Sequence, residues 1–64
     1  MKQIIMPQTG EQWRELRESK GLNWAMLKVD LGSAYMSYQW RLEKGEGVGY
    51  WKALRLAIYL NNHE

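Results

Sequence analysis

The chain has 64 residues, a formal net charge of +2 and no cysteine. A chain of this length forms one small domain that buries only about 60% of the surface its unfolded form exposes, which excludes a large enzyme with a deep cleft. Without cysteine, disulfides, thiol catalysis and cysteine-rich zinc sites are excluded, so burial of apolar side chains must stabilise the fold. Four Trp and four Tyr are the large aromatic groups available for that core.

Charge is unevenly distributed along the chain. The first helix carries the acidic residues Glu11, Glu15 and Glu18. The second half carries Arg41, Lys44, Lys52 and Arg55, with only Glu43 and Glu46 near them. This asymmetry predicts a basic side that suits an anionic partner. No apolar run approaches the roughly 20 residues of a membrane span, and the start of the chain lacks the apolar length of a secretion signal. We therefore expect a cytoplasmic protein without a membrane partner.

The first elements are an arm over residues 1–8 and a helix over residues 10–20. The β-branched pair Ile4 and Ile5 favours a short β-strand over residues 2–6, and Pro7 ends it. Thr9, followed three residues later by Gln12, forms a capping box that starts the helix. Gly21 ends this helix, and Leu22 is positioned to fold back over its apolar face.

Two short helices joined at a glycine follow, over residues 23–31 and 33–44. Asn23 is a good N-cap, and Trp24, Leu27 and Leu31 repeat at the spacing of one helical face. Gly32 ends the second helix, and Ser33 is predicted to cap the third. Such a corner can place one helix in a groove of DNA.

The last elements are a glycine-rich loop over residues 45–49, a helix to about Leu60 and a tail over residues 61–64. The loop lacks the lysine and serine of a phosphate-binding loop. The single histidine, His63, lies in the tail, where an organised base or metal ligand is not expected. We therefore predict no catalytic residue, metal site, cofactor or small-molecule substrate, and the protein is not expected to be an enzyme.

The segments TGEQWRELRESKGLNWAMLKVDLG, RLEKG and KALRLAIYL, taken in order, resemble the phage lambda repressor and Cro-like (XRE-type) helix-turn-helix family over residues 9–60. This resemblance implies an all-α, compact domain of four to five helices. It also implies a sequence-specific transcriptional regulator of repressor type that occupies a double-stranded DNA operator as a homodimer.

The chain departs from the family pattern at two places. The segment from Leu31 to Glu43 is one residue longer than the usual spacing, which alters the turn or the start of the third helix. Lys28 stands where the family commonly has alanine, at a close approach of two helices. Its long charged side chain requires either a different crossing or an outward path.

The resemblance places the outer face of helix 33–44 in the major groove of DNA. The expected base contacts are Tyr35, Met36, Ser37, Gln39, Trp40 and Arg41, and Arg41 is the best candidate to read guanine with its planar fork. The expected phosphate contacts are Asn23, Lys44 and Lys52.

Several alternatives stay open at this stage. An inward position of the third helix falls on either Gln39 or Tyr38, and we favour Tyr38 because burying its ring stabilises more. Trp40 suits the core better than a DNA contact by residue type. A dimer is expected either through the residue 2–6 strand or through Tyr50, Tyr59 and Leu60. The alternative function is a small protein-interaction module that uses exposed aromatic side chains.

Overall fold

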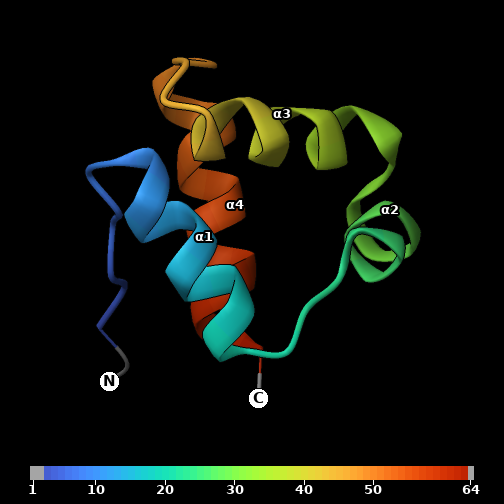
Figure 1. The fold of residues 1–64 in the computed structure, drawn as a ribbon. Helices are drawn as coiled ribbons and strands as arrows, with labels where there is room; N and C mark the ends of the chain where they lie inside the picture. Colours follow the sequence, from blue (N-terminus) through green and yellow to red (C-terminus); the bar gives the residue numbers. More distant parts are fainter. Residues whose placement is uncertain (1–2, 64) are drawn as a thin grey trace.

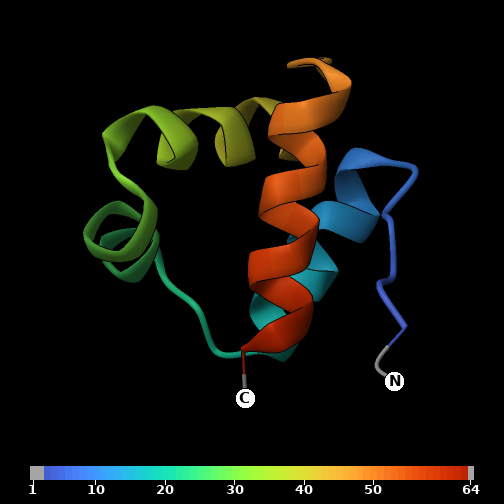
Figure 2. The same ribbon diagram turned by 180° about the vertical axis from the view of Figure 1, so that it is seen from behind.

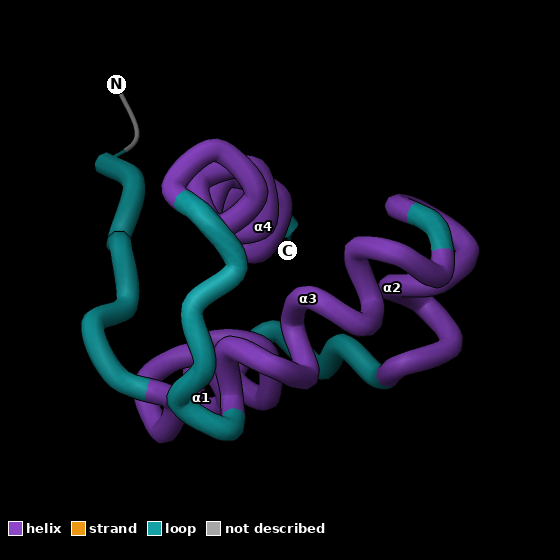
Figure 3. Tube along the Cα trace, turned by 90° about the horizontal axis from the view of Figure 1, so that it is seen from above, coloured by secondary structure: helices purple, strands orange, loops and turns teal. Residues whose placement is uncertain are grey.

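The computed structural model describes residues 3–63, which form four α-helices: α1 (Gly10–Ser19), α2 (Trp24–Leu31), α3 (Ser33–Glu43) and α4 (Tyr50–Asn62). α3 packs against each of the other three helices, and α1 also contacts α4. α1 and α4 lie below the second half of α3, and α2 lies below its first turn (Figure 1). The view along α4 separates α2 from α4 clearly (Figure 3). The expected all-α class is thus confirmed, and no helix among residues 3–63 is both long and apolar enough to cross a membrane.

α1 begins at the predicted Thr9 cap and ends before Gly21, but the Gln12 side chain bonds the Gln8 N–H and not that of Thr9. The Thr9 hydroxyl accepts a hydrogen bond from the Gln12 backbone N–H (3.1 Å), while the Gln12 side-chain oxygen accepts one from the Gln8 N–H (2.6 Å). At the other end, Gly21 adopts φ +68° and the Leu22 N–H donates to the Arg17 carbonyl at 3.2 Å. This is a Schellman ending, and it turns Leu22 into the core.

The corner between α2 and α3 is tighter than a usual helix-turn-helix. Gly32 alone separates the two helices, where such motifs generally use three to four residues. Its backbone angles, φ 101° and ψ 162°, lie in a region that essentially only glycine occupies. The prediction that Ser33 caps α3 is wrong, because Gly32 holds the cap position and Ser33 is the first helical residue.

The core collects apolar side chains from all four helices and from the α1–α2 loop. Its buried members are Trp13, Leu22, Leu27, Leu42, Ala53, Leu56, Ala57 and Leu60. Trp13 is thus the tryptophan in the centre, whereas Trp40 and Trp51 are 52% and 77% exposed. The expectation that Trp40 belongs to the core is wrong. Leu60 is fully buried and cannot belong to a dimer surface.

The N-terminal arm is bound to α4 without forming a strand. Residues 3–8 have no regular secondary structure, so the strand prediction is wrong for that part of the arm, and Lys2 lies outside the described residues. The Asn61 side chain accepts from the Ile5 N–H (2.9 Å) and donates to the Ile5 carbonyl (2.9 Å) and the Ala57 carbonyl (2.7 Å). One amide side chain thus supplies the partner that a neighbouring strand would have offered, and the arm runs alongside α4 (Figure 2).

The contact of Asn61 with the arm also shows that the folded domain ends later in the chain than predicted. Asn61 was expected in a tail over residues 61–64, but it is 7% exposed and lies inside α4, which extends to Asn62. Glu64 lies outside the described residues.

Candidate nucleic-acid interface

α3 has one face toward the protein and one toward solvent. Gln39 and Leu42 are buried on the inner face, with Tyr35, Met36 and Glu43 half-buried beside them. At 100° per residue, the opposite face carries Ser33, Ala34, Ser37, Trp40, Arg41 and Lys44. All of these are exposed except Ser37, which is half-buried. The outward face therefore holds four of the nine side chains expected to contact DNA: Ser37, Trp40, Arg41 and Lys44.

Gln39 is a correction to the expected base contacts. Its side chain has no exposed surface, and its amide nitrogen donates to the Trp13 carbonyl (3.3 Å) and to the Glu43 carboxylate (2.8 Å). Tyr38, the side chain we expected at the inward position, is half-buried. Two hydrogen bonds satisfy the buried amide nitrogen, whereas the amide oxygen is buried without a hydrogen-bond partner. Gln39 is thus unavailable to a base edge.

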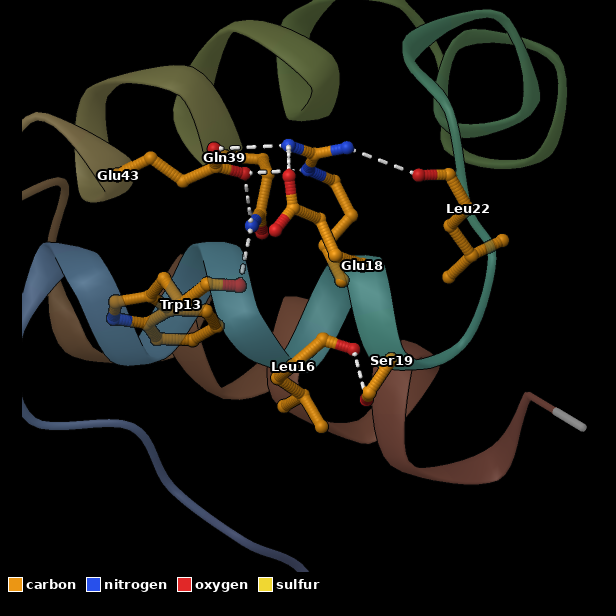
Figure 4. Close-up of polar contacts among 8 residues, drawn as sticks. Trp13, Leu16, Glu18, Ser19, Leu22, Gln39 and Glu43 are labelled. Carbon is orange, nitrogen blue, oxygen red and sulfur yellow. Dashed lines mark hydrogen bonds and ion pairs between the residues drawn. The ribbon is translucent and has the colours of Figure 1, made fainter.

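A buried ionic cluster joins α1, α3 and the loop between α1 and α2 (Figure 4). The Arg17 guanidinium holds both carboxylate oxygens of Glu43, through Nε at 2.7 Å and Nη2 at 3.2 Å, and its Nη1 donates to the Leu22 carbonyl at 3.0 Å. The Gln39 amide nitrogen donates to Glu43 Oε2, the same oxygen that accepts from Arg17 Nε. Sequence analysis missed this site. The available signal was the spacing of Arg17 four residues after Trp13, which puts a cation on the inner face of α1.

This cluster shapes the charge of the outward face. Glu43 is the one carboxylate in the α3 sequence, and the contact with Arg17 turns it inward. Arg41 and Lys44 therefore stand on a helix face to which α3 contributes no acid. The nearest acidic neighbour is Glu46 in the following loop, whose carboxylate lies 3.9 Å from the Lys44 ammonium.

Tyr35 and Tyr38 are half-buried and contact α4. Their rings meet edge to face at 5.3 Å between centroids, the Arg55 guanidinium lies 5.5 Å from the Tyr35 ring and the Lys52 ammonium 4.9 Å from the Tyr38 ring. These contacts fasten α3 to α4 through cation–π attraction. Tyr35, expected to touch a base, is thus committed to packing, while the exposed Lys52 stays at the edge of the α3 surface.

Met36 is one of the residues that line an apolar groove between α2 and α3. The groove has a volume of about 330 Å³ and is lined by Trp24, Met36, Ser37 and Trp40. Behind its wall, the Arg17 guanidinium lies 4.4 Å from the Trp24 ring centre, and on the other wall the Lys44 ammonium lies 4.1 Å from the Trp40 ring centre. The two tryptophans are therefore each held by a cation.

The start of α2 carries the remaining expected phosphate contact. The Asn23 side-chain oxygen accepts from the Met26 N–H at 2.9 Å, which confirms its role as N-cap. Asn23 is exposed, and the positive end of the helix dipole lies beside it. Lys28, the departure from the family pattern in α2, is exposed and so takes the outward path.

A second polar contact links α2 to α4 away from this surface. The Tyr59 hydroxyl donates a short hydrogen bond to the Asp30 carboxylate. Partial burial, this hydrogen bond and the negative charge of Asp30 together raise the pKa of Tyr59 to about 12.

Comparison with known proteins yields no relative: no protein-family model, curated protein or solved structure matches the chain. The chain defines a four-helix, all-α domain with one cationic, partly aromatic helix face.

Proposed function

We propose that this protein is a sequence-specific, double-stranded DNA-binding transcriptional regulator, of the Cro and repressor type, that reads an operator with α3. The observation that carries the proposal is the outward face of α3, where Arg41 and Lys44 are exposed beside Ser37 and Trp40 while Glu43 is drawn inside. A helix of 11 residues is about 16 Å long, which suits a major groove about 12 Å wide. The regulator performs no catalysis and needs no cofactor.

The side chains of the outward face divide into two roles. Arg41 reads guanine through its fork, and Ser37 bonds a neighbouring base edge. Lys44 and Lys52 neutralise phosphates, and the Asn23 end of α2 receives another phosphate at the helix N-terminus. In this proposal α2, Gly32 and α3 form the helix-turn-helix, with a turn that is shorter than in the family it resembles.

The test pairs two arginine variants. Arg41→Ala should weaken binding to a duplex selected from random DNA by about 10-fold to 100-fold and relax the preference at one base pair. Arg14→Ala, a matched exposed arginine on α1, should change neither affinity nor preference. Fluorescence anisotropy with labelled duplex measures both, and circular dichroism verifies that each variant is folded.

Salt dependence separates DNA binding from the alternative of a protein-interaction module. Affinity for the duplex should fall steeply and linearly in log–log form as salt rises, because phosphate contacts release counterions. A selected duplex bound no better than random DNA, or an Arg41→Ala variant identical to the parent, would contradict the proposal.

A homodimer is the second part of the proposal, and the surface of α4 supports it. Trp51 is 77% and Ile58 42% exposed, and they flank a groove of about 430 Å³ that Leu31, Leu54 and Tyr59 also line. An exposed apolar patch of this kind marks a contact with another protein. The same patch is what favours the protein-interaction module, with a different protein as partner.

A further inference from the structure

No other part of the described chain fills the apolar groove between α2 and α3. It is lined by Trp24 of α2 and by Met36, Ser37 and Trp40 of α3. Trp40 is 52% exposed, an unusual state for a tryptophan in a domain of this size. Because Trp40 remains this exposed, packing of the protein's own core does not explain why these apolar side chains lie together.

The groove is held in shape from behind. Arg17 lies against the Trp24 ring while its own guanidinium is fixed by Glu43 and the Leu22 carbonyl. Lys44 lies against the Trp40 ring. The Trp24 and Trp40 rings are thus held in place without a ligand, which lowers the entropy cost of ordering them on binding.

The charges around the groove select an anionic partner. Arg41 and Lys44 are exposed on the same face of α3, and α3 offers no outward carboxylate there. An apolar groove cannot satisfy a phosphate or a polar base edge. On the surface of duplex DNA, the apolar group that the major groove presents is the C5-methyl of thymine.

We infer that the Trp24, Met36 and Trp40 groove receives a thymine methyl group and so makes the protein select a T·A pair beside the position that Arg41 reads. This inference rests on the proposed function, because it needs α3 to lie in the major groove. The polarizable Met36 sulfur and the two indole rings supply the dispersion contacts that a methyl group makes.

The test removes the methyl group and nothing else. In a duplex selected from random DNA, each thymine is replaced in turn by deoxyuridine, which lacks only the C5-methyl. At one position, or two adjacent positions, the replacement should weaken binding about fourfold, the factor that corresponds to burying one methyl group.

Protein variants assign the effect to the groove. Met36→Ala and Trp40→Ala should bind the thymine and deoxyuridine duplexes equally, because the methyl contact is already lost. Arg41→Ala should bind both more weakly while keeping the fourfold ratio. A ratio that persists in Met36→Ala and Trp40→Ala would place the methyl contact elsewhere and overturn the inference.

Fluorine NMR of protein containing fluorotryptophan gives a second readout. The Trp24 and Trp40 signals should shift on adding the thymine duplex, whereas the buried Trp13 is the internal control. Duplex binding with unshifted Trp24 and Trp40, or without any deoxyuridine effect, overturns this inference and leaves the proposed function standing. Failure to bind any duplex overturns both, and leaves the groove to a protein partner.

Discussion

Single residues decide how α3 is oriented, and Arg17 is the clearest case. Its guanidinium is buried with the Glu43 carboxylate, and both side chains are about one-tenth exposed (11% and 9%). Replacing Arg17 by methionine leaves a buried carboxylate without its cation. We expect Arg17→Met to lower the free energy of unfolding by about 3 to 5 kcal/mol, measured by urea denaturation.

Two further variants make the Arg17 prediction specific. Arg14→Met removes an exposed arginine from the same helix and should change stability by less than about 0.5 kcal/mol. The double variant Arg17→Met with Glu43→Leu replaces the ion pair by apolar groups and should recover most of the loss. Equal stability of Arg17→Met and the parent would contradict a stabilising role of the ion pair.

The sequence predicts least well which individual side chain of α3 is buried. Tyr38 and Gln39 are adjacent, and hydrophobicity alone favours burying the ring. The structure buries Gln39 because the Trp13 carbonyl and the Glu43 carboxylate accept from its amide, and these acceptors come from residues 26 and 4 positions away. Arg41 and Lys44 could be assigned to the exposed face from sequence because no such partner competes for them.

Tyr59 gives a prediction about pH. Its pKa is raised to about 12 from 10.0 by burial and by Asp30, so the folded protein retains a proton that the unfolded chain releases. Between about pH 10 and pH 12 the unfolded state therefore binds fewer protons than the folded state, and stability falls as pH rises. An absorbance titration of tyrosinate should show one late ionisation that Tyr59→Phe removes. An unchanged late phase in that variant would assign the raised pKa to another residue.

At the scale of elements, the helix boundaries can be predicted from the capping residues, whereas the geometry of the α2–α3 corner cannot. Thr9, Gly21 and Asn23 place three helix boundaries, the two ends of α1 and the start of α2, where the sequence predicts them, because caps are local interactions. The α2–α3 corner depends on packing between two helices, so the pattern could locate Gly32 but not the single-residue connection. The N-terminal arm is a similar case, because its partner Asn61 is 56 residues away.

Gly32 carries a prediction at this scale. With φ +101°, a side chain at this position is strained even though an added Cβ would meet nothing within 4 Å. Gly32→Ala should therefore lower the free energy of unfolding by about 1 to 3 kcal/mol, through the backbone alone. Gly47→Ala is the matched control, because that position is equally open and has no positive φ. Thermal denaturation compares the two, and equal losses would contradict a conformational requirement at Gly32.

At the scale of the whole molecule, the surfaces proposed for DNA and for a second copy are separate. α1, α2 and α4 lie on one side of α3 (Figure 1). The outward side chains Trp40, Arg41 and Lys44 of α3 are exposed. Trp51, Leu54 and Ile58 are spaced three and four residues apart, so they form one ridge along α4. In a two-fold pairing of antiparallel α4 helices, Trp51 of each copy would lie against Ile58 of the other. Such a symmetric contact stops at a dimer.

Pairing through α4 has a consequence for DNA binding that can be measured. One α3 reads about half of an operator, so a dimer should bind two half-sites one helical turn apart much more tightly than one. Trp51→Ala should weaken dimerisation in analytical ultracentrifugation by about 30-fold or more, because it removes a large exposed anchor. Its affinity for a single half-site should equal the parent's, since Trp51 is on α4 and not on the outward face of α3. Val29→Ala, which trims another exposed apolar residue (83% exposed), should leave both measurements unchanged. A parent protein that stays monomeric while binding the full operator cooperatively would exclude α4 as the contact and require the DNA itself to couple the two copies.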